Sequence, residues 1–128
     1  MADRKTFNWT DPHHDLPFSP ATRIGDTLYI SGQVGVERAT RSVVPGGIGP
    51  QTRRALQNLE EVLELAGVTL QNVAKVNVFL TEMSDFEAFN AAYREFFPTD
   101  PPSRTTVGTS GLSKPEMLIE IEAIATAV

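Results

Sequence analysis

The sequence predicts an α+β fold of two layers, in which a mixed β-sheet carries two helices on one face. Three observations predict it: strands that alternate apolar and polar residues, two amphipathic helical segments between them, and the element order ββαβαββ. The 128 residues have the length of one domain, and 41% of them are hydrophobic, which is enough to fill one core. We therefore expect a single domain over residues 1–128.

The first segments of the chain predict an arm and a hairpin. Residues 1–16 are polar and turn-prone, so we expect a flexible N-terminal arm that is able to become ordered against the fold. Two β-rich runs start at Ala21, and Gly25-Asp26 between them suits a tight hairpin. The Gly- and Pro-rich residues 38–50 predict a loop over the surface.

Two amphipathic helices follow from the spacing of apolar residues. Residues 51–66 carry apolar side chains three and four positions apart, and Gly67 supplies a C-terminal cap. Residues 84–87 match a capping box and predict the start of a second helix, which ends before Pro98. The second helix has a stripe of aromatic residues, and large apolar side chains of this kind are expected in the core.

Three further strands are predicted. Residues 73–81 alternate, with Ala74 on the apolar side, and form a half-buried strand. Residues 104–109 predict a short strand and residues 117–128 a long one. The last strand ends in small apolar residues, which would leave apolar surface on a monomer and so favour self-association. These residues are Ala123, Ile124, Ala125 and Ala127.

Sorting the strands by alternation predicts a sheet with two unlike faces. The apolar face, expected beneath the helices, carries Leu28, Ile30, Val76, Val78, Val107, Ile119 and Ile121. The opposite face collects Ser31, Gln33, Lys75, Asn77, Arg104, Thr106, Glu120 and Glu122, with Tyr29 and Phe79 among them. An arginine and a glutamate on one face can hold a small carboxylate and polarise a water, although an ordinary exposed ion pair has the same composition.

Composition excludes several classes of site. The chain has no cysteine, so it has no disulfide, no thiolate metal site and no cysteine nucleophile, and we expect a reducing, cytoplasmic location. No apolar run is long enough for a secretory signal or a membrane span. The net charge of −5 and the scattered Lys and Arg residues disfavour nucleic-acid binding.

Several motifs together resemble the Rid family, also called the YjgF or RidA-like family of reactive intermediate deaminases. The resemblance covers residues 17–125. The motifs are PFSPA at residues 17–21, LYISGQVG at 28–35, QTRRALQNLEEVLELAG at 51–67, KVNVFLTEMSDFEAFNAAYREFF at 75–97, PPSRTTV at 101–107 and IEIEAIA at 119–125.

The resemblance implies a chorismate-mutase-like subunit that assembles as a homotrimer, with three sheets forming a central barrel and clefts between neighbouring subunits. It implies that Arg104 binds the substrate carboxylate and that Glu120 positions the hydrolytic water, while Ser31 and Gly32 line the cleft. Two residues depart from the usual family pattern. Phe18 stands where a cleft tyrosine is frequent, and Thr106 stands where many members carry a cysteine.

The expected function is therefore the hydrolysis of 2-enamino and 2-imino acids, such as 2-aminoacrylate, to 2-keto acids and ammonia, without a metal or an organic cofactor. The alternative is a protein of the same fold that binds metabolites or other proteins without turnover, which the missing cleft tyrosine makes credible. Ribonuclease activity is disfavoured by the acidic charge. A metal site at His13 and His14 is disfavoured because no third ligand has matching spacing.

Overall fold

The computed structural model of the chain describes residues 3–10 and 16–128. Within these residues, one six-stranded mixed sheet, one two-stranded sheet and two α-helices form the fold. In chain order the elements are β1 (Arg4–Phe7), β2 (Ala21–Ile24), β3 (Thr27–Val34), β4 (Val36–Glu37), β5 (Ser42–Val43), α1 (Ile48–Leu65), η1 (Leu70–Asn72), β6 (Val73–Leu80), η2 (Met83–Asp85), α2 (Phe86–Phe96), β7 (Ser103–Gly108) and β8 (Ile119–Thr126).

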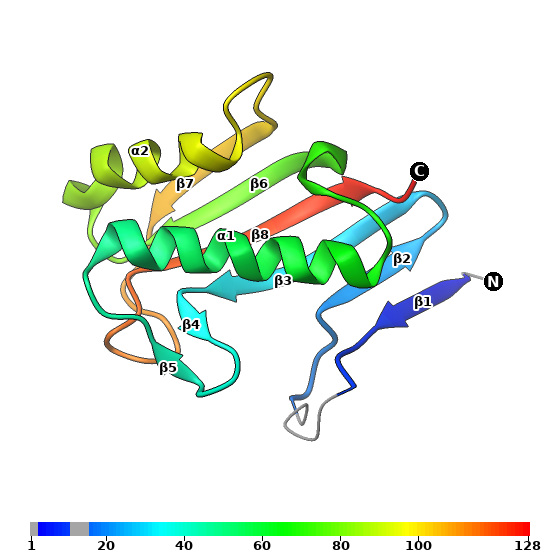
Figure 1. Cartoon of the computed structure of the whole chain (residues 1–128), viewed down its shortest axis with the longest axis horizontal. Helices are drawn as coiled ribbons and strands as arrows, with labels where there is room; N and C mark the ends of the chain where they lie inside the picture. The colour runs from blue at the N-terminus through cyan, green and yellow to red at the C-terminus, as the bar shows by residue number, and fades with distance from the viewer. Residues whose placement is uncertain (1–2, 11–15) are drawn as a thin grey trace.

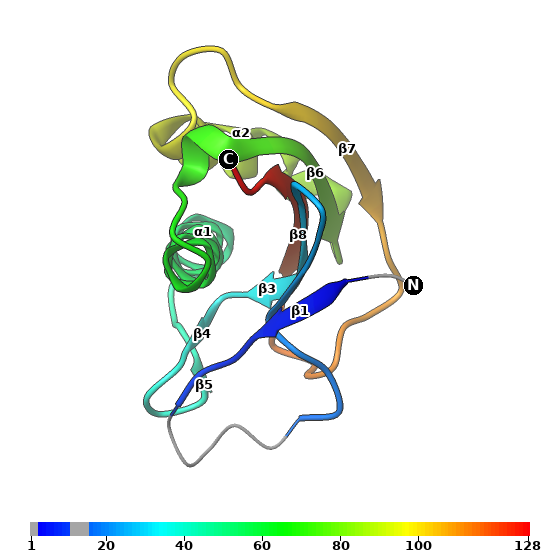
Figure 2. The same cartoon turned by 90° about the vertical axis from the view of Figure 1, so that its right-hand side faces the viewer.

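The large sheet has the strand order β1-β2-β3-β8-β6-β7. Strands β6 and β7 pair in parallel, and the other described pairs of this sheet are antiparallel. Both α-helices of the described residues lie on one face of the sheet, and no helix of these residues covers the other face (Figures 1 and 2). The predicted two-layer α+β fold is confirmed, and the predicted ββαβαββ order corresponds to β2, β3, α1, β6, α2, β7 and β8.

The core lies between the two helices and the sheet. Leu56, Leu59 and Phe89 from the helices are fully buried against Val76 and Ile121 of the sheet. Helix α1 ends as predicted, because Gly67 adopts the left-handed conformation (φ 77°) and its N–H donates to the Glu64 carbonyl. A side chain at this position would be strained, so glycine favours the end of the helix here.

Part of the N-terminal region is ordered against the sheet. Residues 4–7 form β1, which pairs along β2, so this segment of the expected arm is ordered against the fold, as its sequence allowed. The strand is short, charged and largely exposed, which is why its sequence lacks the alternation of a half-buried strand. His13 and His14, considered above as a metal pair, lie outside the described residues. Part of the predicted loop at residues 38–50 also forms structure, as β5 and the first turn of α1.

Two local predictions fail for identifiable reasons. The capping box at residues 84–87 does not form, because Ser84 and Asp85 belong to the 3-10 turn η2 and the start of α2 has no side-chain cap. Ala74 is exposed rather than buried, because the pairing of β6 with β8 shifts between Val73 and Lys75 and Ala74 is the extra residue.

Much of the apolar surface predicted at the end of β8 is buried within the subunit. Ala123 and Ala125 are buried under the helices, so these two alanines were wrongly counted as exposed. Ile124 alternates with them and is 36% exposed on the uncovered face. On the same face, Tyr29 is 49% exposed and Val107 is 43% exposed. The apolar surface available for association therefore comes from several strands and not from the end of β8 alone.

Candidate active site

Arg104 and Thr106 lie on the helix side of the sheet, which corrects the prediction that they share a face with Glu120. The parallel register of β7 pairs Arg104 with Val76 and Thr106 with Val78. Paired residues direct their side chains to the same face, and both valines are fully buried beneath the helices. Alternation showed which residues of β7 share a face, but the pairing with β6 determines which face that is.

The remaining side chains of β7 therefore occupy the uncovered face. Lys75 Nζ donates a hydrogen bond to Thr105 Oγ1 there at 2.8 Å. Val107, which was expected under the helices, is exposed on that face instead.

The guanidinium of Arg104 is held by α2. Its Nη2 donates to Asn90 Oδ1 at 2.8 Å, and its Cζ lies 4.7 Å from the ring centroid of Tyr93 and 4.9 Å from that of Phe89. Phe86 is a third ring at 5.8 Å. Cations are attracted to aromatic faces at these distances, so the rings fix the orientation of the guanidinium. Residues 86–93 thus support a cation in addition to filling the core.

Arg104 is half-buried, and no carboxylate among residues 3–10 and 16–128 forms an ion pair with it. A guanidinium has several N–H donors, and only one donates to Asn90. The buried hydroxyl oxygen of Thr106, on the same face of the sheet, has no hydrogen-bond partner in the described part of the chain. Burial raises the pKa of Tyr93 to about 12 against the opposing charge of Arg104, so this hydroxyl stays neutral.

A second group of predicted residues gathers on the other side of the sheet, around Glu120. The pairing of β3 with β8 shifts between Ile30 and Gln33, which places Ser31 and Gly32 in a bulge. The Glu120 carboxylate packs against Gly32 so closely that an added Cβ would lie 2.6 Å from Glu120 Cδ. Glycine is therefore required at this position for Glu120 to keep its place.

Hydrogen bonds hold the bulge in place, and burial raises the pKa of the Glu120 carboxyl. Ser31 Oγ donates to the Ser19 carbonyl at 2.7 Å, and Ser31 N–H donates to the Pro20 carbonyl at 2.9 Å. Burial raises the pKa of Glu120, and the nearby charge of Glu122 raises it further. A carboxylate with a raised pKa is a better proton acceptor than an exposed glutamate.

A groove of about 750 Å³ contains Glu120 and its neighbours. Phe18, Ser31, Gly32 and Glu120 all line it, so the structure brings four of the six predicted site residues together. Arg104 and Thr106 do not line it and lie on the opposite face of the sheet. Within a single chain, the proposed carboxylate-binding and water-positioning groups are therefore separated by the sheet.

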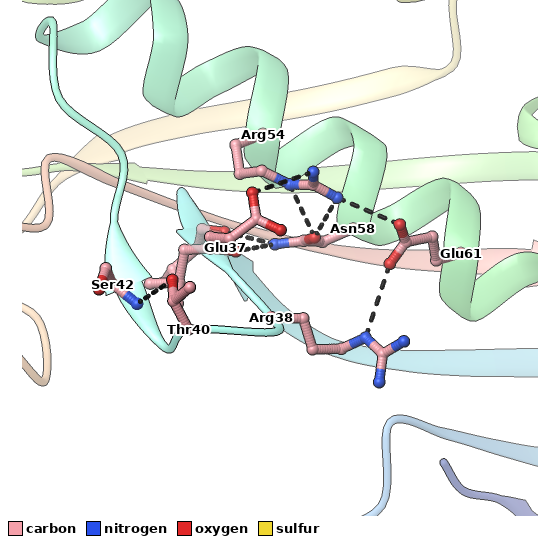
Figure 3. A network of polar contacts seen from close by, with 9 residues as sticks. Glu37, Arg38, Thr40, Ser42, Arg54, Asn58 and Glu61 are labelled. Carbon is pink, nitrogen blue, oxygen red and sulfur yellow. Dashed lines mark hydrogen bonds and ion pairs between the residues drawn. The ribbon is translucent and has the colours of Figure 1, made fainter. Parts of the chain in front are cut away.

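Sequence reasoning missed the residues that hold the end of the groove. Asn58 is buried on α1, and its Nδ2 donates to the carbonyls of Val34 and Val36 at 2.9 Å each. Arg54 donates from Nε and Nη2 to Asn58 Oδ1, and its Nη2 donates to Glu61 (Figure 3). The signal in the sequence was a polar residue within the apolar stripe of the helix.

Gln51 plays a similar role two turns earlier on α1. It is 4% exposed, accepts a hydrogen bond from Leu118 N–H and donates one to the Glu116 carbonyl. No group of three or more His, Asp or Glu residues in the described ranges is arranged to hold a metal ion. Among the same residues, the helices are too short or too polar to cross a membrane.

Comparisons with known proteins show the family of the chain. A family model described as "Endoribonuclease L-PSP" matches residues 10–127. A "RutC family protein" from Sulfurisphaera tokodaii is 44% identical over 110 residues, which cover 86% of this chain and 87% of that protein. The chain belongs to the Rid (YjgF) family.

Other Rid proteins carry more specific names. A mouse protein named "2-iminobutanoate/2-iminopropanoate deaminase" is 39% identical over 109 residues, covering 85% of this chain and 80% of that protein. The crystal structure of RidA from an Antarctic Psychrobacter bacterium superposes with a TM-score of 0.87 at 32% identity. That superposition covers 95% of this chain and 98% of the RidA chain, so the whole Rid fold is shared.

Proposed function

We propose that the protein is a Rid-type deaminase, which hydrolyses 2-imino acids and their 2-enamino tautomers, such as 2-aminoacrylate, to 2-keto acids and ammonia. The observation that carries the proposal is the half-buried guanidinium of Arg104, which three rings and Asn90 orient and which has no carboxylate partner among the described residues. Such a group is suited to bind the carboxylate of a small acid with two parallel hydrogen bonds.

We propose that each site is shared by two subunits of a homotrimer. Arg104 and Glu120 of one chain lie on opposite faces of its sheet, so a second copy is needed to bring an arginine and a glutamate together. The uncovered sheet face supports such an assembly, because Tyr29, Val107 and Ile124 expose apolar surface on it. Three sheets packed around a central axis would bury this face.

In the proposed reaction, Arg104 of one subunit binds the substrate carboxylate and fixes the imine carbon. Glu120 of the neighbouring subunit accepts a proton from water as the water oxygen bonds to the carbon and the C=N π electrons move to nitrogen. Glu120 then returns that proton to the nitrogen, which gives a carbinolamine. As the C–N bond breaks and the carbonyl forms, the hydroxyl proton passes through Glu120 to the nitrogen, which leaves as ammonia. Imino acid and water thus give keto acid and ammonia, and no metal or organic cofactor takes part.

Ser31, Gly32, Phe18 and Thr106 complete the proposed site. Ser31 and Gly32 form the bulge that holds Glu120 next to the groove. Phe18 is 52% exposed beside the groove and offers an apolar contact to the substrate. Thr106 presents a hydroxyl oxygen without a described partner on the same face as Arg104. The net charge of −5 favours this reading over cleavage of RNA, despite the name of the family model.

The proposal is tested by ammonia release from imines that an amino-acid oxidase generates in the assay. We expect the protein to accelerate the release of ammonia from 2-iminopropanoate, and Arg104→Met and Glu120→Gln each to abolish most of the acceleration. Equal rates of ammonia release with and without the protein would refute the deaminase proposal and favour a protein that binds metabolites without turnover.

Subunit mixing tests the shared site. When Arg104→Met and Glu120→Gln trimers are mixed equally and exchange subunits, three quarters of the trimers are mixed and each has one intact site of three, so roughly a quarter of the parent activity should return. If both groups acted within one chain, every site would lack one of them and no activity would return. The two variants incubated without subunit exchange serve as the control.

A further inference from the structure

We propose that the groove beside Glu120 is a subsite for an aromatic side chain, so that the protein acts on 2-imino acids derived from aromatic amino acids. This inference rests on the proposed function and names its substrate class. It concerns the part of the groove formed by Trp9, Leu16, Phe18 and Met117, which we call the aromatic wall.

The aromatic wall is continuous with the reacting end of the groove. The same cavity is lined by Ser31, Gly32 and Glu120, so a substrate whose imine carbon lies near Glu120 can extend its side chain along the wall. The volume of about 750 Å³ falls within the range of about 300–1,000 Å³ that is usual for small-molecule sites. A substrate as small as 2-iminopropanoate would leave most of this space to water.

Trp9 is held in place before any ligand binds. The guanidinium of Arg38 stacks over its ring with Cζ 4.0 Å from the centroid, and Arg38 Nε lies 3.7 Å from Glu61 Oε2. Glu61 accepts a hydrogen bond from Arg54, which also donates to Asn58 on α1 (Figure 3). This chain of contacts connects the indole to the helix, so little side-chain entropy remains to be lost on binding.

The chemistry of the aromatic wall favours a ring over an aliphatic chain. Phe18 is 52% exposed and Leu16 is 57% exposed, so a ligand can cover apolar surface that faces water. Two aromatic side chains and the thioether of Met117 line the wall together. Rings pack against one another in offset or edge-to-face arrangements, and thioether sulfur contacts ring edges favourably.

Substrate preference provides the first test. Imines of phenylalanine and alanine are generated by an amino-acid oxidase, and kcat/KM is measured for both. We expect the phenylalanine imine to have the higher kcat/KM. Trp9→Ala should lower the ratio of kcat/KM for the phenylalanine imine to kcat/KM for the alanine imine by at least about tenfold. Trp9→Phe keeps a ring and should retain most of the preference. Val128→Ala removes apolar surface from the exposed C-terminal residue and should leave the ratio unchanged.

Fluorescence provides a second test that does not depend on turnover. Trp9 is the single tryptophan of the chain, so emission excited near the red edge of its absorption reports on the aromatic wall alone. We expect 3-phenyllactate, an unreactive analogue, to change this emission at concentrations at least about tenfold lower than lactate.

The outcomes separate the two proposals. If neither imine is hydrolysed, the proposed function fails. The aromatic subsite is refuted, and the deaminase proposal stands, if the protein hydrolyses the alanine imine without preferring the phenylalanine imine. In that case 3-phenyllactate would also change the Trp9 emission at no lower concentration than lactate does.

Discussion

Replacement of Arg104 by methionine removes the group on which the proposed chemistry depends while keeping a long side chain for packing against α2. Arg104 already donates one hydrogen bond to Asn90, and its other donors are available for a carboxylate. Two charge-assisted hydrogen bonds of about 1.5–3 kcal/mol each give about 3–6 kcal/mol. At about 1.4 kcal/mol per factor of ten, kcat/KM should fall by about a hundredfold to ten-thousandfold.

The assay is ammonia release from 2-iminopropanoate, with substrate concentration varied so that kcat and KM are separated. Arg53→Met is the matched control, because Arg53 forms an exposed ion pair with Glu95 between the helices at 2.9 Å and lies outside the proposed site. Sedimentation and thermal unfolding of both variants show whether fold and assembly persist. An Arg104→Met protein that assembles like the parent and keeps its kcat/KM would refute the assignment of Arg104.

Three further predictions concern the surroundings of Glu120. Because the charge of Glu122 contributes to the raised pKa of Glu120, activity should decline as pH falls through that raised pKa, and Glu122→Gln should move the decline to lower pH; an unchanged acid limb in the pH profile of kcat/KM would contradict this. Gly32→Ala should displace the Glu120 carboxylate and lower kcat at least about tenfold, with thermal unfolding near that of the parent; parent-like kcat would show that the close packing does not matter. Asn58→Ala leaves two carbonyls without their donor and should cost about 2–4 kcal/mol in the free energy of unfolding, measured by urea denaturation; a loss below about 0.5 kcal/mol would show that water replaces the amide.

The elements that bury one face could be predicted from the sequence. Leu56, Leu59 and Val62 in α1 and Val76 and Val78 in β6 recur with the period of their element, and each is fully buried. Burial of one face forces this periodicity on the sequence, so the sequence alone predicted the layers, the order of the elements and the end of α1 at Gly67. The shared motifs predicted the Rid family, which the comparisons confirm.

The positions of the proposed site residues could be predicted only in part. Ser31, Gly32 and Glu120 were expected to lie together, and they do, but the bulge that joins them has no signature in the alternation of β3. Arg104 was placed on the wrong face, because an edge strand with the sequence SRTTVG has no apolar majority to show which side is inward.

Backbone pairing and the packing of α2 decided what the sequence left open. The register of β7 on β6 turned Arg104 toward Tyr93 and away from Glu120, although the residues themselves are compatible with either face. Periodicity is a local property of the chain and fixes only relative positions within one element. The face, the bulge and the neighbour of each side chain depend on contacts between distant segments, and these exist only in the folded structure.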